Sequence, residues 1–145
     1  MYTIDASVHL NALSPAEANS ATSQAFLALV RRQQIPLFCP TLLLVEVAAA
    51  VARALDDTDR AVALAAALRG LPNQTLVPLD EALTDHAIVL AATARLRGAD
   101  AVYAAVAQRY GTTLITLDRQ QLNRLPPLVS TALPADVLNE MGASD

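Results

Sequence analysis

The stretch GADAVYAAVAQRYGTTLITLD, residues 98–118, decides the fold class that the sequence predicts. Asp100 opens a predicted helix that continues through AVYAAVAQRY and ends at Gly111, a residue type common at helix ends. The following TTLITL is a short apolar run rich in β-branched residues, which predicts a buried strand ending at Asp118. A helix that leads within a few residues into a buried strand is typical of α/β proteins with a parallel sheet.

The rest of the chain repeats this alternation. Buried strands are predicted at MYTIDA, ending at Asp5, at IPLFCP, ending at Pro40, and at TLVPL. The tail from Leu125 offers a short strand and a last turn or helix. Further helices are predicted over residues 14–34, 41–55, 58–68 and 80–97. We therefore expect one three-layer α/β/α domain over residues 1–145, with a central, mostly parallel sheet.

The clearest predicted helix start is Ser14. Pro15 suits the first position of a helix, and Glu17 stands where a capping box places its acidic residue. Thr41 and Asp80 are predicted to cap the helices that follow them.

Composition and charge limit the class of protein. The 145 residues are 54% hydrophobic, with a mean hydropathy of +0.36, which is ample for a packed core. The net charge of −4 argues against a protein that coats nucleic acid non-specifically. It still allows an enzyme that acts on nucleic acid through a local site and a bound cation.

No segment is expected to enter a membrane or to direct secretion. Apolar runs end well before the roughly 18 residues that a membrane span needs. The N-terminal MYTIDASVHL lacks the basic start and long apolar stretch of a signal peptide. The single cysteine, Cys39, cannot form an internal disulfide, which fits a reducing cytosol. We therefore expect a cytoplasmic protein, and the abundant alanine with no lysine suggests a bacterial source.

Several common catalytic motifs are absent from the sequence. The four glycines lie far apart, which excludes a glycine-rich phosphate loop. One cysteine and two separated histidines cannot form a zinc site of the usual spacing. A receiver domain also uses clustered acids on an α/β sheet, but it needs a lysine, and this chain has none.

Four acidic residues interrupt apolar segments, and they are the candidate active-site residues. Asp5 and Asp118 end predicted strands. Asp100 starts a predicted helix, and Glu46 lies about one turn into another. Ligands of α/β proteins gather beyond the carboxyl ends of the strands, so all four side chains are expected in one cleft. Crowded carboxylates repel one another, and a hard divalent cation such as Mg²⁺ or Mn²⁺ relieves that repulsion.

Glu46 is the acid whose charge most clearly lacks a partner in the sequence. The residues one turn away on either side are leucines and alanines, so no charged neighbour on its own helix can pair with it. An unpaired buried carboxylate is unfavourable. We therefore expect Glu46 to face a cation rather than another side chain.

Each acid also has an ordinary structural interpretation. Asp100 alone serves equally well as a helix N-cap, and Asp118 could cap RQQLNRL with Gln121 completing a capping box. Asp5 could simply end a strand, and Glu46 could reach solvent. Only the four together, in this order and setting, favour a functional site.

These segments resemble the PIN-domain proteins of the VapC type, the toxins of bacterial type II toxin–antitoxin modules. The matching stretches are IDAS, LLLVEVAAAVAR and LRGADAVYAAVAQRYGTTLITLD. The resemblance implies a PIN-like fold and a ribonuclease dependent on Mg²⁺ or Mn²⁺. It implies that the catalytic and metal-binding acids are Asp5, Glu46, Asp100 and Asp118. It also implies an RNA substrate, a small antitoxin protein as partner, and a homodimer.

The resemblance assigns supporting roles too. Ser7 and Thr116 match positions that often support the metal ligands, although ordinary hydrogen bonds at strand ends explain them equally well. Many relatives carry a further acid a few residues after the last one, where this chain has Gln120 and Gln121, which leaves a second metal position open. The implied products end in 5′-phosphate and 3′-hydroxyl groups.

Arginines near the acids are candidate phosphate contacts. Arg53 lies two turns beyond Glu46 on the same predicted helix face, and Arg119 follows the last acid. Arg95 and Arg97 precede the third acid. Two other functions stay open, namely a PIN-fold nuclease outside toxin–antitoxin systems and a catalytically inert binding module whose acids are caps and surface.

Overall fold

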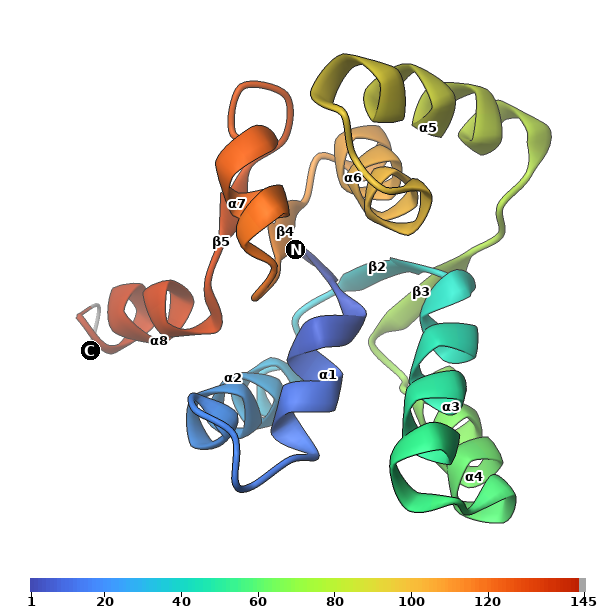
Figure 1. Ribbon diagram of the computed structural model, residues 1–145. Helices are drawn as coiled ribbons and strands as arrows, with labels where there is room; N and C mark the ends of the chain where they lie inside the picture. Colours follow the sequence, from blue (N-terminus) through green and yellow to red (C-terminus); the bar gives the residue numbers. More distant parts are fainter. Residues whose placement is uncertain (144–145) are drawn as a thin grey trace.

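The strands form a five-stranded parallel sheet with the order β3-β2-β1-β4-β5 (Figure 1). The protein is described here by a computed structural model that covers residues 1–143. The central strand β1 has β2 on one side and β4 on the other, and it meets β4 in the register Tyr2 with Thr113 and Ile4 with Ile115. The strands are β1 (Tyr2–Ile4), β2 (Leu37–Pro40), β3 (Gln74–Val77), β4 (Thr113–Ile115) and β5 (Thr131–Ala132).

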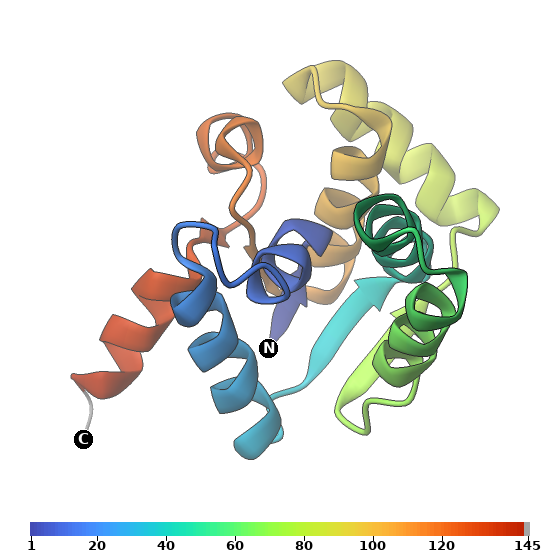
Figure 2. The same ribbon diagram turned by 60° about the horizontal axis from the view of Figure 1, so that its bottom comes forward.

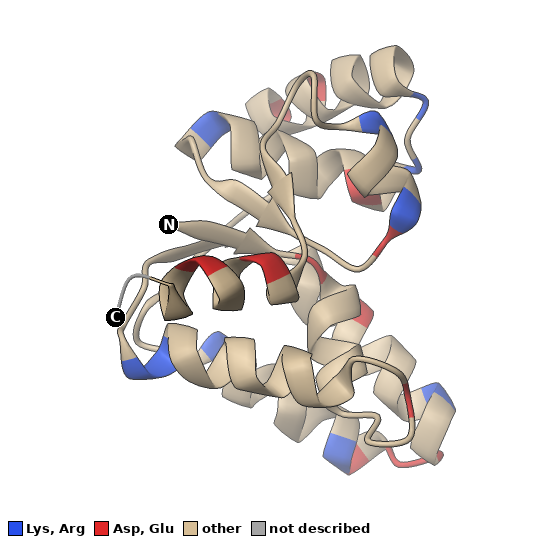
Figure 3. Cartoon of the chain, turned by 90° about the vertical axis from the view of Figure 1, so that its left-hand side faces the viewer, with Lys and Arg blue, Asp and Glu red and all other residues tan. Residues whose placement is uncertain are grey.

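Helices cover the sheet on both faces, as the sequence predicts. Helix α6 lies against β1, β2 and β4, and α5 packs on α6. Away from these two helices, α1 packs on α2 and α3 packs on α4 (Figure 2). Seen edge-on, the sheet separates these two groups of helices (Figure 3). The helices are α1 (Ala6–Ala12), α2 (Ser20–Arg32), α3 (Leu42–Leu55), α4 (Thr58–Arg69), α5 (Glu81–Ala94), α6 (Gly98–Tyr110), α7 (Arg119–Arg124) and α8 (Pro134–Gly142).

Helix α6 is the centre of the core. Its residues from Ala101 to Ala107 are all buried, because the sheet covers one side and α5 the other. The many alanines let these neighbours approach closely. Gly111 ends the helix with φ of +61°, a left-handed conformation that glycine adopts without a steric penalty. The predicted transition from this helix into a strand is confirmed.

The predicted helix start at Ser14 is wrong. Residues 14–19 form turns, and α2 begins at Ser20. The Asn11 side chain explains the difference: its amide nitrogen donates to Glu17 Oε2 at 3.3 Å and to the Ala18 carbonyl at 2.9 Å. The capping acid is thus engaged by α1, a short helix that the sequence analysis did not predict.

Most other predicted elements are confirmed with shifted ends. Asp80 caps α5 by accepting from the Leu83 N–H at 2.7 Å. That helix ends at Ala94 rather than near residue 97, because Arg95 is left-handed with φ of +53°. The Thr41 side chain makes no capping hydrogen bond to α3. Among the described residues, no helix is long and apolar enough to cross a membrane.

Candidate active site

The four candidate acids line one open pocket at the carboxyl edge of the sheet. The chain proceeds from β1 to β2 and β3 on one side and then returns to β4 on the other, so the strand order reverses between β1 and β4. Asp5 directly follows β1, and Thr116 directly follows β4. Such a reversal is where α/β proteins bind ligands. The pocket has a volume of about 470 Å³, and its lining includes Asp5, Glu46, Asp100 and Asp118.

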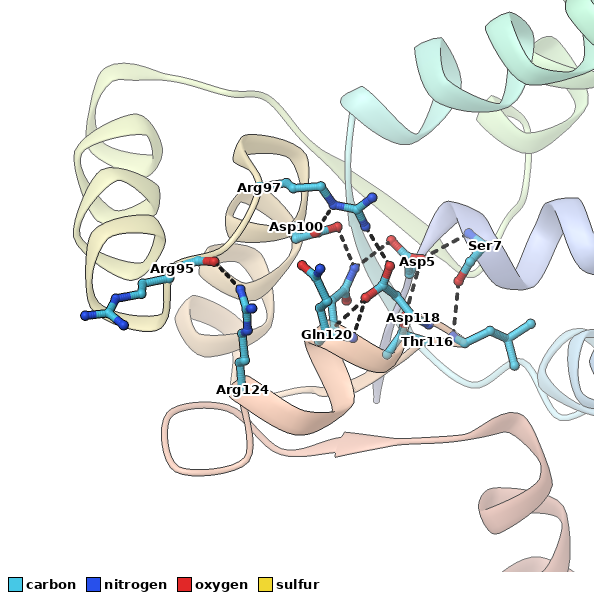
Figure 4. A network of polar contacts seen from close by, with 11 residues as sticks. Asp5, Ser7, Arg95, Arg97, Asp100, Thr116, Asp118, Gln120 and Arg124 are labelled. Carbon is cyan, nitrogen blue, oxygen red and sulfur yellow. Dashed lines mark hydrogen bonds and ion pairs between the residues drawn. The ribbon is translucent and has the colours of Figure 1, made fainter.

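Asp5 is buried at the base of this site, with 6% of its surface exposed. Its Oδ2 accepts from the Ser7 N–H at 3.1 Å and from the Thr116 hydroxyl at 3.4 Å, and its Oδ1 accepts from Gln121 Nε2 at 3.3 Å (Figure 4). Burial raises the pKa of Asp5, and the hydrogen bonds from Ser7 and Gln121 oppose that rise. The first acid is therefore both an N-cap of α1 and a member of the pocket.

Asp100 lies next to Asp5 and shares a donor with it. It occupies the first turn of α6, where Arg97 rather than Asp100 is the N-cap residue, and it is 5% exposed. Asp100 Oδ1 accepts from Gln121 Nε2 at 2.8 Å. Gln121 is fully buried, and its amide nitrogen thus bridges two carboxylates. One interpretation of the sequence places Gln121 in a capping box with Asp118. In the structure its amide nitrogen donates to the two carboxylates.

Asp118 and Asp100 are joined by Arg97. The guanidinium donates from Nε to Asp100 Oδ2 at 2.8 Å and from Nη2 to Asp118 Oδ2 at 2.6 Å (Figure 4). These two carboxylates, that of Asp100 first, raise the pKa of Arg97. Asp118 also caps α7, because its Oδ1 accepts from the backbone N–H groups of Gln120 and Gln121.

Glu46 has a side-chain partner, which corrects the expectation that it would face only a cation. The buried Tyr103 hydroxyl donates to Glu46 Oε2 at 2.6 Å. Burial raises the pKa of Glu46, the Tyr103 hydrogen bond opposes this rise, and the charges of Asp5 and Asp100 add to it. Tyr103 lies three residues after Asp100, on the same side of α6. That spacing, in a stretch from Ala101 to Ala107 whose other residues are all alanine or valine, is the signal that could have identified it.

Ser7 and Thr116 connect the strand ends to the acids. The Ser7 hydroxyl accepts from the Leu117 N–H at 3.1 Å. The Thr116 hydroxyl accepts from the Asp118 N–H at 3.0 Å while it donates to Asp5. Both side chains are thus engaged within the site, and each makes a hydrogen bond near a strand end.

The four arginines considered as phosphate contacts occupy different places. Arg53 and Arg97 line the acid pocket. Arg119 lines an adjoining pocket together with Ser7. Arg95 is not among the residues that line the acid pocket; it lies at the end of α5, and its side chain points away from the acids (Figure 4).

The donor set suits a hard divalent cation in type. Carboxylate and hydroxyl oxygens are the ligands that Mg²⁺ and Mn²⁺ favour. Within residues 1–143, no three acidic, histidine or cysteine side chains already surround a point where a metal ion could bind. The buried amide of Gln121 and the guanidinium of Arg97 instead occupy oxygens of Asp5, Asp100 and Asp118. The residue types therefore suit a divalent cation. In this structure their oxygens accept hydrogen bonds from Gln121 and Arg97 instead.

Comparisons with known proteins identify the family and agree with the fold. The family model for the PIN domain matches residues 2–126. The solved structure of FitAcB from Neisseria gonorrhoeae is similar, with a TM-score of 0.71 and 20% identity over 93% of this chain and 99% of that one. VapC20 from Mycobacterium tuberculosis, a sarcin–ricin loop cleaving toxin, has a TM-score of 0.70 and 18% identity over 82% and 91%. VapBC2 from Rickettsia felis, bound to a promoter DNA fragment, has a TM-score of 0.67 and 12% identity over 91% and 97%. No curated protein sequence matches the chain.

Proposed function

Because the chain belongs to the PIN-domain family, we propose that it is a divalent-metal-dependent ribonuclease and the toxin of a toxin–antitoxin pair. The observation that carries the proposal is the convergence of four acids on one pocket. They come from the end of β1, from α3, from the first turn of α6 and from the segment after β4. Four separate segments placing carboxylates at the strand-order reversal support a catalytic site more than four unrelated caps.

The similar structures support the choice of substrate and partner. VapC20 is a toxin that cleaves the sarcin–ricin loop. Other similar structures include a toxin–antitoxin complex from Klebsiella pneumoniae and FitAB bound to a DNA fragment. From VapC20 we infer an RNA substrate for this chain. From the Klebsiella pneumoniae complex and FitAB we infer an antitoxin partner.

Each acid has a role in the proposed hydrolysis. A bound Mg²⁺ or Mn²⁺ would activate a water molecule and neutralise negative charge on the phosphate. Asp5, Asp100 and Asp118 would hold the cation. Glu46, with one oxygen fixed by Tyr103, would bind the cation or orient the water. Products with 5′-phosphate and 3′-hydroxyl ends are expected, and 2′,3′-cyclic phosphate ends would contradict the mechanism.

The RNA must meet positive charge outside the acids. Arg53 lines the same pocket from α3, and Arg119 lines the adjoining one. Guanidinium groups pair with phosphate oxygens through two parallel hydrogen bonds. We therefore assign phosphate contacts to both residues, in keeping with an acidic protein that binds nucleic acid only locally.

A test of the function compares two matched Asp-to-Asn changes. Asp100→Asn removes a carboxylate from the pocket, whereas Asp59→Asn removes an exposed one in the first turn of α4. With Mn²⁺ and cellular RNA, Asp100→Asn should cut cleavage by roughly 100-fold, since even outer partners of a metal change activity by roughly 10- to 100-fold. Asp59→Asn should cleave like the wild type. Equal cleavage by both variants would assign the activity to a contaminant, and no cleavage by the wild type would favour the inert binding module.

A second pocket, lined by both apolar and polar side chains, lies next to the acids and suits the antitoxin. It has a volume of about 340 Å³, and Leu10 and Ala50 line both this pocket and the acid pocket. Leu13 and Leu55 on its rim are about half exposed, at 48% and 50%. We propose that an antitoxin segment binds here and covers the acids. Co-purification with the product of the neighbouring gene tests this assignment; its absence would favour a PIN-fold nuclease outside toxin–antitoxin systems.

Sedimentation at high concentration tests the proposed homodimer.

A further inference from the structure

Arg97 places a positive charge directly among the acids. It is the N-cap residue of α6, and its side chain is 64% exposed while that of Asp100 is 7% and that of Asp118 is 23% exposed. The guanidinium therefore lies at the mouth of the pocket and bridges Asp100 to Asp118. Each of its two contacts is a charge-assisted hydrogen bond shorter than 3 Å, at 2.8 and 2.6 Å.

The bridge uses the outer oxygen of each carboxylate. Asp100 Oδ1 is already bound to the buried amide of Gln121, and Asp118 Oδ1 is bound to backbone N–H groups of α7. Those inner donors are fixed by burial or by the backbone. The outer oxygens, Oδ2 of both residues, accept from Arg97. A divalent cation that uses these oxygens would place its charge next to the guanidinium, and the repulsion between the two positive charges favours displacement of Arg97.

We propose that Arg97 exchanges between two partners: it neutralises Asp100 and Asp118 while no divalent cation is bound, and it contacts the RNA phosphate once the cation has displaced it. The inference rests on the proposed nuclease function and adds a residue whose two roles alternate. The guanidinium is 64% exposed, so water can solvate it when the bridge opens. A cation then repels the guanidinium, which stays tethered at the pocket mouth, where a phosphate would arrive.

The chain offers a matched control for this proposal. Arg53 lines the same pocket with the same charge but, in the part of the chain that the structure describes, forms no ion pair with the four acids. Arg53→Ala removes one positive charge from the pocket without freeing a carboxylate. Arg97→Lys keeps the charge of Arg97 but cannot reproduce the planar fork that bridges two acids.

The first measurement is Mn²⁺ affinity, by titration calorimetry without RNA. Arg97→Ala should bind Mn²⁺ roughly threefold to tenfold more tightly than the wild type, the range expected from losing two ion contacts made by a largely exposed guanidinium. Arg97→Lys should fall between them, and Arg53→Ala should change the affinity less than Arg97→Ala does. The Arg97 side chain makes no capping hydrogen bond to α6, so its removal should leave the fold intact; Arg97→Lys supplies the same test if it does not.

The second measurement is RNA binding as a function of salt. The probe is a short, fluorescein-labelled single-stranded RNA with a phosphorothioate backbone, which slows hydrolysis, followed by anisotropy. With Mn²⁺ present, Arg97→Ala should bind this RNA more weakly, and the slope of log affinity against log salt should fall by about 0.7, the value for one lost phosphate contact on a single strand. Without Mn²⁺ the slope should not change, because Arg97 is then held by Asp100 and Asp118.

The proposal requires opposite signs: tighter Mn²⁺ binding and weaker RNA binding in the same variant. Weaker binding of both would make Arg97 a positioning residue for the acids and overturn the exchange. Unchanged Mn²⁺ affinity, or an RNA effect that is the same with and without Mn²⁺, would overturn it too. If the wild type and every variant bind no Mn²⁺, the proposed function itself fails; if the wild type binds Mn²⁺ and cleaves RNA but Arg97→Ala is not tighter, only this inference fails.

Discussion

At the scale of single residues, the Tyr103 hydroxyl opposes the effect of burial on the pKa of Glu46. The phenol donates to Glu46 at 2.6 Å and lowers the pKa that burial raises. Tyr103→Phe removes only this donor, so the pKa of Glu46 should rise further and Mn²⁺ should compete less well with protons. Calorimetry should show a few-fold greater loss of Mn²⁺ affinity between about pH 7.5 and about pH 5.5 than in the wild type.

Tyr110→Phe is the control for this change. Tyr110 lies at the end of the same helix, where its ring stacks on Phe38 at a centroid distance of 4.5 Å. It does not line the acid pocket. The two variants should therefore differ only in Mn²⁺ binding at low pH. Identical profiles of Mn²⁺ affinity against pH would show that Tyr103 has no role in the site.

At the scale of elements, helix α6 is bounded by two glycines with different roles. Gly111 is left-handed with φ of +61°, whereas Gly98 is not, and a Cβ atom added at either would meet no atom within 4 Å. Gly111→Ala should destabilise the protein by about 1 kcal/mol, because the left-handed conformation is unfavourable for alanine. Gly98→Ala should be neutral or stabilising by up to about 1 kcal/mol, since alanine favours helix. Urea unfolding measures both, and equal effects would contradict the assigned roles.

The elements also show where sequence reasoning succeeds. Strand ends are marked by apolar runs that stop at a polar residue, so the positions of Asp5 and Asp118 beside the sheet followed from local pattern alone. Local spacing can mark a side chain such as Tyr103 as a candidate, but it does not identify the partner in a distant segment. The hydrogen bond from Tyr103 to Glu46 joins residues 57 apart, and Arg97 reaches Asp118 over 21 residues. The roles of the four acids in metal binding and catalysis stay predictions.

At the scale of the whole molecule, two sets of buried groups make the stability of the metal-free protein depend on pH in opposite directions. Burial lowers the pKa of His9 to about 4, so the unfolded chain binds more protons there, and stability is lost as the pH falls from about 6.5 towards 4. Burial raises the pKa values of Asp5 and Glu46. For these acids the folded chain binds more protons, and stability is lost as the pH rises through the window above about 4.

Two variants should separate these contributions. His9→Leu should leave a stability that falls as the pH rises from about 4 to 7, whereas Asp5→Asn should weaken that fall and leave the rise due to His9. Saturating Mn²⁺ should abolish the fall in His9→Leu, because a bound cation favours the ionised carboxylates. Thermal unfolding in chelator and in Mn²⁺ measures this. If stability depended on pH in the same way in both variants, His9 and the acids would not have opposite effects on stability.

The position of β1 has a consequence for synthesis of the chain. The central strand β1 is made before its neighbour β4, which brings Thr116 to Asp5 across 111 residues. A growing polypeptide therefore carries no complete acid pocket until the segment beyond Asp118 has left the ribosome. Products of translation that stops before Asp118 lack the pocket, so a cell that makes this chain meets its proposed activity only after that segment has been synthesised.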